Sequence, residues 1–337
     1  MRLSILDQAP IVGGSSPAEA LRAAVALAQA GERLGYARYW LAEHHGLGGL
    51  ACSTPEVMLG MIGWATSRIT LGAGAILLPY YKPYKVAETF RLLASLFPGR
   101  IDLGVARSPG GPAEMSMALS DNYLERALRM PADFAELVRY LDGEEPGIPG
   151  AEPAVRTKAP ALGARGDRPV PWVLGTSVKS ASLAAAHGTG YAYGHFMNRE
   201  NTKGAVAAYR DGFDGTRGRE PYVVLAVSAV CADTLAKAEE IARGVRAWRI
   251  LAGMGQGGDG IPATGEADRL LAEAKADDPP APDEDDAMIV GDPASVRDRL
   301  IRLQRTFGAD ELMIVSYAHD FVDRVRSYEL IMEACGR

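Results

Sequence analysis

The run Ile69-Thr70-Leu71-Gly72-Ala73-Gly74-Ala75-Ile76-Leu77-Leu78 is the longest apolar stretch of the chain and predicts a buried strand. Shorter apolar runs at 37–41 and 101–106 flank it and predict two more strands. Apolar residues at helical spacing fill the intervals 55–64 and 85–97, which predicts a helix in each. Strands joined by helices in this way are parallel, because a parallel neighbour is reached only through a long crossover connection.

The alternation of strand and helix continues through the rest of the chain. Further strands are predicted at 3–6, 170–174, 191–196, 222–231 and 311–316. Further helices are predicted at 18–31, 122–141 (with a break near Pro131), 178–186, 200–210, 235–251, 293–307 and 321–334. About eight strands, nearly all followed by a helix, predict a closed (β/α)8 TIM barrel, since an open doubly wound sheet usually stops at about five or six. No G-x-G-x-x-G motif follows the first strand, which argues against a dinucleotide-binding open sheet.

Two segments do not fit the repeating units. A length of 337 residues suits about two average domains, but the repeated pattern predicts one barrel domain over 1–337. The segment 143–168 is rich in Pro, Gly and Ala and is predicted as a long loop. The insertion 253–287 follows the seventh strand and is predicted as a mobile lid or a disordered insertion, because it is too long for a passive connector.

The overall charge and the cysteine content exclude several classes of protein. The net charge of −6 gives no general attraction to nucleic acid or to an anionic membrane. The 3 cysteines lie far apart, so neither a disulfide framework nor a zinc knuckle is expected. The first apolar run ends at Asp7, too early for a signal peptide, and no stretch approaches the roughly 18 apolar residues of a membrane span. The sequence therefore predicts a cytoplasmic protein.

Polar residues that directly follow the strands are the candidate site residues, because barrel enzymes place their sites at the carboxyl ends of the strands. Gly175, Thr176, Ser177 and Ser180 follow the fifth strand, where the next helix begins. The hydroxyls and the free N–H groups of this helix start, with Arg107 after the fourth strand, predict a site for a phosphate monoester. The alternative is that Ser177 only caps its helix and that Arg107 pairs with a surface acid.

The sequence Glu43-His44-His45 follows the second strand and indicates acid–base chemistry. A histidine at the end of a barrel strand can take up or release a proton near neutral pH. Adjacent strand residues point to opposite faces, so the two histidines are not expected to share a metal ion, and no metal site is predicted. A hydrogen-bonded packing role for either histidine stays open. The small residues Gly72 to Gly74 likewise allow either a flat ligand against the backbone or close packing in the barrel core.

These pieces, in this order, resemble the bacterial luciferase-like flavin monooxygenases over nearly the whole chain. The matching segments are Trp40-Leu41-Ala42-Glu43-His44-His45, Ile69-Thr70-Leu71-Gly72-Ala73-Gly74-Ala75 leading to Pro79, Gly99-Arg100-Ile101-Asp102-Leu103-Gly104-Val105-Ala106-Arg107, Pro171-Trp172-Val173-Leu174-Gly175-Thr176-Ser177 and Val290-Gly291-Asp292-Pro293. The family fold is a (β/α)8 barrel that binds reduced FMN. Ala106 stands where the luciferases have a reactive cysteine, so the resemblance indicates a non-luminescent member.

The resemblance also implies a role for each candidate site residue. His44 would be the active-site base, with Glu43 and His45 beside it as catalytic residues. The central flavin ring would lie against Gly74 and Ala75, where family members often have a non-proline cis peptide bond. The cofactor-binding set that it implies is Gly74, Ala75, Arg107, Arg126 (or its rival Arg129), Gly175, Thr176, Ser177, Ser180 and His195.

The activity implied by the resemblance is that of the oxygenase in a two-component system. A separate flavin reductase would supply reduced FMN, oxygen would add at carbon 4a of the flavin, and the peroxide would oxygenate an aldehyde, a ketone or an aromatic small molecule. Closure of the segment 253–287 would keep water out. A homodimer is expected through the helices at 55–64 and 85–97. Three tyrosines, Tyr80, Tyr81 and Tyr84, would line an apolar pocket or cover the barrel rim.

Three other functions stay open. A deazaflavin cofactor would pass hydride to an alcohol or an imine in the same fold, and it needs the same phosphate site. A non-catalytic flavin-binding subunit is a second alternative, although such chains tend to lose the histidine or the lid. A metal-dependent barrel hydrolase would use His44, His195, His319 and Asp320, but the first strand lacks the His-x-His pair that such hydrolases need.

Overall fold

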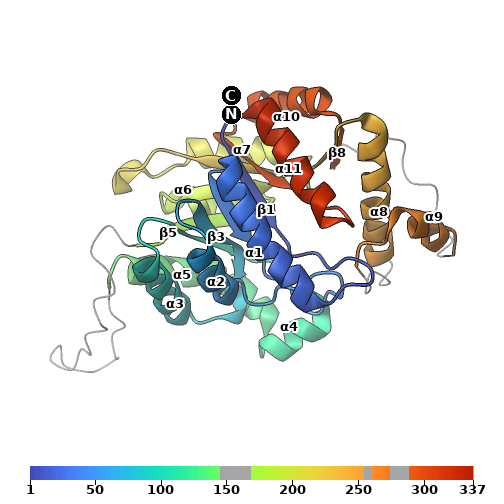
Figure 1. The fold of residues 1–337 in the computed structure, drawn as a ribbon. Helices are drawn as coiled ribbons and strands as arrows, with labels where there is room; N and C mark the ends of the chain where they lie inside the picture. The colour runs from blue at the N-terminus through green and yellow to red at the C-terminus, as the bar shows by residue number, and fades with distance from the viewer. Residues whose placement is uncertain (145–167, 254–259, 274–287, 337) are drawn as a thin grey trace, which may run out of the picture.

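The structure, a computed structural model, describes residues 1–144, 168–253, 260–273 and 288–336. Its parallel strands close into a barrel in the order β1, β2, β3, β4, β5, β6, β7 and β9, and β9 returns to β1 (Figure 1). The predicted (β/α)8 barrel is therefore confirmed. The strands are β1 (Leu3–Asp7), β2 (Arg38–Leu41), β3 (Thr70–Leu77), β4 (Ile101–Ala106), β5 (Val170–Gly175), β6 (Gly190–Gly194), β7 (Val223–Cys231), β8 (Met288–Gly291) and β9 (Glu311–Val315).

Helices surround the barrel and connect its strands. They are α1 (Pro17–Leu34), α2 (Pro55–Ala65), α3 (Pro83–Leu96), α4 (Ala113–Leu119), α5 (Tyr123–Leu141), α6 (Val178–Ala186), α7 (Thr202–Asp211), α8 (Leu235–Gly253), α9 (Thr264–Glu273), α10 (Pro293–Phe307) and α11 (Phe321–Cys335). The short 3-10 helices are η1 (Leu78–Tyr80) and η3 (Gly215–Arg217). Helix α9 lies within the insertion 253–287, and helix α4 lies in a stretch for which the sequence predicted no helix or strand.

Helix α5 runs through Pro131 without ending there, so the predicted break is wrong. A proline inside a helix removes one backbone hydrogen bond and crowds the preceding turn. The buried side chains of Met130, Phe134 and Leu137 lie on both sides of this proline along one face of α5, which packs against α3. Burial of that apolar face offsets the local cost of the proline.

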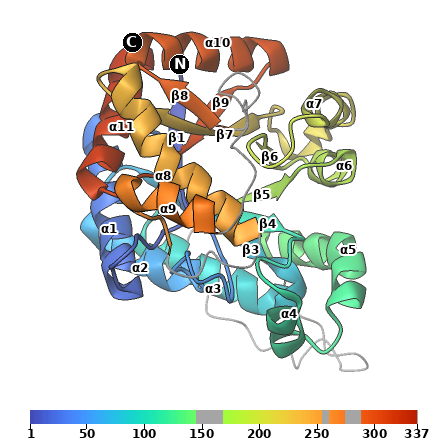
Figure 2. The same cartoon turned by 90° about the vertical axis from the view of Figure 1, so that its right-hand side faces the viewer.

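Strand β7 extends beyond the barrel wall. Its residues 224–228 pair with β9, and its residues 228–231 pair with β8, a four-residue strand too short to give a clear signal in the sequence. Helix α8 contacts both strands, and its Ile241 and Val245 share one buried apolar cluster with Val230 of β7 and Val290 of β8. Helix α8 therefore lies over the barrel opening beside β7, and Figure 2 shows it in front of the strands.

The insertion 253–287 lies partly outside the described residues, as does most of the loop 143–168. Its described part is attached to the barrel, because the Ile261 N–H donates to the carbonyl of Ile11 at 3.0 Å and the Ile261 carbonyl accepts from Gly13 at 2.8 Å. Helix α9 then packs against α8. Residues 254–259 and 274–287 of the insertion lie outside the described residues, and the mobile lid expected over 253–287 stays a prediction.

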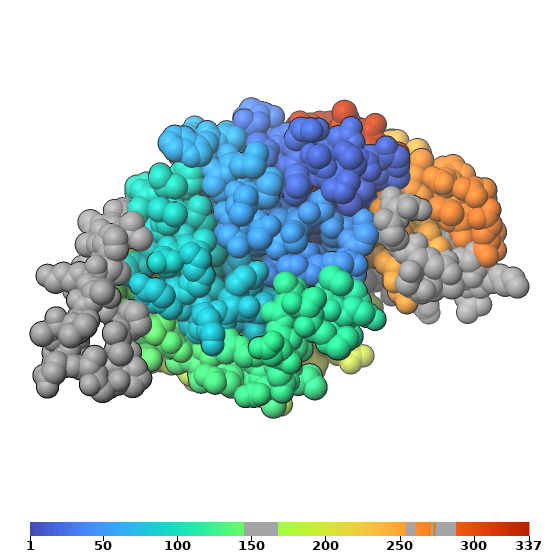
Figure 3. All heavy atoms as spheres, turned by 90° about the horizontal axis from the view of Figure 1, so that it is seen from below, coloured from blue at the N-terminus to red at the C-terminus, as the bar shows by residue number. Residues whose placement is uncertain are grey.

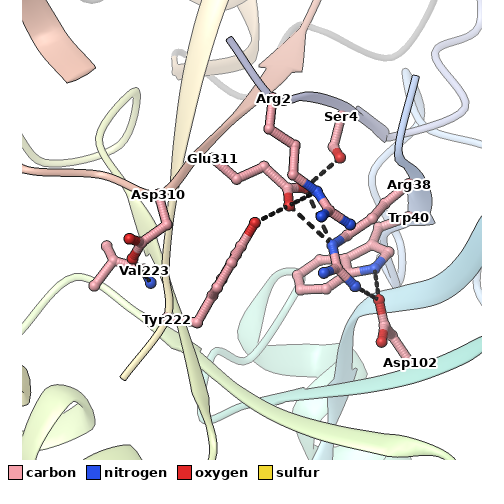
Figure 4. A network of polar contacts seen from close by, with 9 residues as sticks. All are labelled: Arg2, Ser4, Arg38, Trp40, Asp102, Tyr222, Val223, Asp310 and Glu311. Atoms are coloured by element: carbon pink, nitrogen blue, oxygen red, sulfur yellow. Dashed lines mark hydrogen bonds and ion pairs between the residues drawn. The ribbon is translucent and has the colours of Figure 1, made fainter. Parts of the chain in front are cut away.

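A buried network of charges occupies the amino-terminal half of the barrel interior (Figure 4). Arg38 donates to Asp102 Oδ2 at 2.7 Å and to both carboxylate oxygens of Glu311 at 3.1 Å. The indole nitrogen of Trp40 donates to the same Asp102 oxygen at 2.9 Å. The remaining partners of Glu311 are Arg2, Ser4 and Tyr222. Each buried charge thus has a partner of opposite charge and hydrogen bonds, which burial of a charge requires. The hydrogen bond from Trp40 to Asp102 also fixes the position of the Trp40 indole.

Candidate functional site

A cavity of about 620 Å³ opens at the carboxyl ends of the strands, and all eight barrel strands or the loops after them contribute to its wall. Its volume falls in the usual range of small-molecule sites. Most of the predicted site residues line it, namely Glu43, His44, Gly74, Ala75, Arg107, Gly175, Thr176, Ser177 and Ser180. The structure therefore brings together side chains that are up to 137 positions apart in the chain.

The polar corner of this cavity lies where β5 meets α6. Ser177 caps α6: its Oγ accepts from the backbone N–H of Ser180 at 3.3 Å, and Ser180 Oγ accepts from the backbone N–H of Ser177 at 3.3 Å. A side chain at Gly175 would place its Cβ only 2.6 Å from the Cβ of Ser180, so this position requires glycine. The two serines therefore cap the helix and also line the cavity, so the helix-cap role and a ligand-binding role are compatible at this corner.

Arg107 adds a positive charge to the polar corner. Its side chain is exposed and lines the cavity, and within the described residues it forms no ion pair with a carboxylate. The described residues therefore do not support the alternative that Arg107 pairs with a surface acid. A free guanidinium beside the positive end of a helix dipole attracts anions, and phosphate groups above all.

The imidazole of His44 lines the cavity from the end of β2. Its backbone N–H donates to the carbonyl of Cys52 at 2.9 Å, and its Nδ1 atom is buried without a hydrogen-bond partner in the described part of the chain. Burial lowers the pKa of His44 to about 4, and the nearby His45 acts in the same direction. His44 is therefore neutral near pH 7 and able to accept a proton.

Glu43 holds the segment that carries His44. Its Oε1 atom accepts from Tyr81 Oη at 2.8 Å and lies 2.8 Å from Nε2 of His45, and its Oε2 accepts from the backbone of Leu77 at 3.0 Å. Burial raises the pKa of Glu43, and these hydrogen bonds oppose the shift. His45 does not line the cavity, in agreement with the expectation that the two histidines point to opposite sides. Glu43 and His45 therefore tie β2 to the end of β3.

The small residues of β3 accommodate the side chain of Trp40. A Cβ atom at Gly72 would lie 2.5 Å from the Trp40 indole, and one at Gly74 would lie 2.8 Å from Leu6. Gly72 therefore serves packing in the barrel, whereas Gly74 and Ala75 also line the cavity. The peptide bond between them is cis, as the resemblance implied. Trp40 itself forms part of the cavity floor.

Arg126 and its rival Arg129 are not brought to the polar corner. Arg126 donates to the carbonyl of Tyr81 at 2.6 Å and lies 3.2 Å from Asp133, a buried carboxylate that needs a positive partner. Arg129 lies 3.6 Å from the same Asp133. Neither side chain lines the cavity, so the expectation of a second arginine at the phosphate site is corrected.

The remaining predicted histidines also lie outside the cavity wall. His195 is buried, with Nδ1 2.7 Å from Thr202 Oγ1 and its ring 5.1 Å from that of Phe307. The Nδ1 atom of His319 lies 3.0 Å from the carbonyl oxygen of Ile261. Both rings thus have partners outside the cavity wall, and the expected place of His195 beside a cofactor stays a prediction. Within the described ranges, no three His, Cys, Asp or Glu side chains gather as metal ligands.

The far side of the cavity was missed by the sequence analysis. Leu6, Gln8, Ala226 and Met313 line it from β1, β7 and β9. Apolar residues on a barrel strand are predicted to lie in the hydrophobic core, and no pattern in a single sequence distinguishes those that face a ligand. Gln8 could have been predicted, because it is a polar residue directly after the first strand, and polar residues at the ends of the other strands were taken as candidate site residues.

A membrane-spanning helix is absent from the part of the chain that the structure describes.

Known proteins of similar sequence identify the family of this chain. The family model described as luciferase-like monooxygenase matches residues 1–310. The chain is 41% identical to the protein YwcH of Bacillus subtilis, with 98% of each chain covered. It is 32% identical to the N-acetyl-S-alkylcysteine monooxygenase of Bacillus subtilis, with 99% of this chain and 98% of that protein covered. The solved structure of apo-MsnO8 matches with a TM-score of 0.86 and 36% identity, over 99% of this chain and 97% of the other.

Two more distant solved structures share the fold and contain different cofactors. The oxygenating constituent of 3,6-diketocamphane monooxygenase from Pseudomonas putida, in complex with FMN, matches with a TM-score of 0.72 and 18% identity over 99% of this chain and 97% of the other. An F420-dependent secondary alcohol dehydrogenase matches with a TM-score of 0.69 and 13% identity over 99% and 98%. The family model and the full-length relatives show that the chain belongs to the luciferase-like monooxygenases, a family of oxidoreductases.

Proposed function

We propose that this oxidoreductase uses reduced FMN and O₂ to oxygenate an aldehyde, a ketone or an aromatic small molecule. The observation that carries the proposal is the polar corner, where Arg107 has no carboxylate partner among the described residues and lies beside the start of α6. A phosphate monoester would supply the missing negative charge, as the phosphate of FMN does. A deazaflavin is the alternative ligand that the test below must distinguish.

The residues of the cavity fit FMN at two places. Arg107, Thr176 and the Ser177–Ser180 cap would hold the phosphate, and the flat ring would lie beside Gly74 and Ala75, where no large side chain projects. Reduced FMN supplies the electrons that activate O₂. The apolar remainder of the wall would exclude water, which protects a reactive oxidant from unproductive decay.

His44 would manage the protons of this reaction. Because burial keeps its imidazole neutral, Nε2 can accept a proton from substrate or solvent and return it later. Glu43 and His45 would act through position, since their hydrogen bonds fix the segment that carries His44. We assign them a positioning role and His44 the catalytic role.

A separate flavin reductase and a second copy of the chain are the proposed partners. Helices α2 and α3 contact each other and lie on the face seen in Figure 3. This pair of helices exposes large apolar side chains, with Trp64 79% exposed. The others are Val57, Met61, Leu92 and Leu96. An apolar face of this kind supports the expected homodimer through α2 and α3.

Oxygen transfer tests the proposed function. Reduced FMN is supplied by a flavin reductase under ¹⁸O₂, a panel of aldehydes, ketones and polycyclic phenols is offered, and products are analysed by mass spectrometry. We expect one panel member to gain a single ¹⁸O atom. Hydrogen peroxide as the sole product across the panel, or substrate reduction with F420 in the absence of oxygen, would contradict the proposal. The variant His44→Asn should still bind FMN and should lose product formation.

A further inference from the structure

A second cationic side chain, Arg249, lies close to the cavity, behind the residues that line it. Arg249 is in the last turns of α8, the helix that covers the barrel opening beside β7. Its Nη2 atom donates to Ser228 Oγ at 3.0 Å, and its guanidinium carbon lies 5.8 Å from the centre of the Tyr317 ring. Ser228 and Tyr317 are both almost fully buried, so the guanidinium rests on an interior surface.

Arg249 has no negative partner among the described residues. A guanidinium carries five N–H donors, and the hydrogen bonds of Arg249 use one of them, to a neutral hydroxyl. A positive charge held against buried groups without a counter-ion is costly, which makes it a site for an anion from outside the chain. The exposed arginine of the same helix, Arg243, differs in this respect, because it lies 3.4 Å from Asp268.

The surroundings of Arg249 are continuous with the cavity wall. Tyr317 donates its hydroxyl hydrogen to the side-chain oxygen of Gln8, and Gln8 lines the cavity. Ala226, which also lines the cavity, lies two residues before Ser228 on the inner face of β7. In the order of strands, β9 lies across the barrel from β4 and β1 lies across from β5, which carry the polar corner, whereas β7 is two strands from β5. Gln8 therefore marks the end of the cavity opposite the polar corner, and Arg249 lies close to it, behind the residues that line the cavity.

We propose that Arg249, supported by Ser228 and the Tyr317 ring, binds the carboxylate of an apolar organic acid, so that the aldehyde, ketone or aromatic substrate of this enzyme also carries a carboxylate. The inference rests on the proposed function, in which the cofactor phosphate takes the Arg107 corner. Leu6, Ala226 and Met313 give the space between the two ends an apolar wall, suited to a hydrocarbon or thioether chain. The free N–H groups of one guanidinium and the hydroxyl of Ser228 match a single carboxylate group, and the Tyr317 ring holds the guanidinium in place.

Matched acids and amides test this subsite. Octanoate, 4-phenylbutyrate and N-acetyl-S-benzylcysteine, each with its primary amide, are titrated into the FMN-saturated protein and into the FMN-free protein by isothermal titration calorimetry. We expect the wild type to prefer the acid over the amide. The variant Arg249→Gln should weaken binding of the acid by about 10- to 100-fold and leave binding of the amide unchanged, because a charge-assisted hydrogen bond is lost. Arg249→Lys should restore part of the preference.

Arg243→Gln is the matched control on the same helix and should bind both probes as the wild type does. The ratio of acid to amide affinity is the decisive readout, since a structural role of Arg249 would change both affinities together. Equal affinity for acid and amide in all three pairs, or an unchanged ratio in Arg249→Gln, would overturn the inference. FMN binding is followed separately by flavin fluorescence, so a protein that prefers acids and fails to bind FMN would refute the proposed function and leave this subsite intact.

Discussion

The buried imidazole of His44 makes the stability of the folded protein depend on pH in a way that a single substitution removes. Burial lowers the pKa of His44 from its ordinary 6.5 to about 4 in the folded chain. In the unfolded chain the same group takes up a proton near its ordinary pKa. Acid therefore favours the unfolded chain, and the stability contributed by neutral His44 is lost as the pH falls from about 6.5 to about 4.

The size of this effect follows from the shift. A pKa lowered by about 2.5 units corresponds to about 3 kcal/mol in the free energy of unfolding once the folded group is also protonated. Between about pH 7 and pH 5 only part of this is expressed, and the linkage relation gives about 2 kcal/mol. A surface histidine without such a shift would contribute nothing to this difference.

Urea unfolding of the wild type, His44→Asn and His44→Gln at about pH 7, 6 and 5 measures the effect. The wild type should lose about 2 kcal/mol more than either variant over this range. Other titrating groups are common to the three proteins, and the packing lost in each variant is the same at every pH, so both cancel in the comparison. Parallel pH dependence in all three proteins would refute the conclusion that the cavity holds His44 neutral.

Three further substitutions test the polar corner and the assembly. Arg107→Gln should weaken FMN binding by about 10- to 100-fold and leave riboflavin, which has no phosphate, unaffected in a fluorescence titration; equal losses for both ligands would speak against a phosphate contact. Gly175→Ala should lower the free energy of unfolding by about 1–3 kcal/mol in urea and weaken FMN binding, because its Cβ meets Ser180; wild-type behaviour in both assays would show that Ser180 is not held beside β5. Trp64→Glu should convert a dimer to a monomer in analytical ultracentrifugation, whereas a monomeric wild type would rule out the proposed α2–α3 interface.

Hydrophobic periodicity predicts all eight strands of the barrel to within two residues, because each apolar run is buried on both faces and separated by a helix. It does not predict β8, whose four residues exist as a strand only because β7 extends past the barrel and offers them an edge. Helix α9 was missed for a related reason, since it forms against α8 within a stretch of loop-like composition.

The candidate site, too, could be predicted only in part from the sequence. Strand-end position identified His44, Arg107 and the Ser177–Ser180 corner, because the barrel brings strand ends together whatever lies between them in the chain. The destination of a long side chain depends on partners that the sequence does not place. The resemblance implied Arg126 at the corner, but its side chain forms an ion pair with the buried carboxylate of Asp133 instead. No sequence pattern marks Arg249 as a site residue, because its position depends on how α8 packs beside the barrel opening.

Binding of reduced FMN and of reduced F420, each titrated into the same protein without oxygen, shows which cofactor the cavity selects. We expect tighter binding of FMN, with its phosphate at Arg107 and the start of α6, and a loss of that advantage in Arg107→Gln. Tighter binding of F420 by the wild type, or FMN binding that is unchanged in Arg107→Gln, would contradict this expectation.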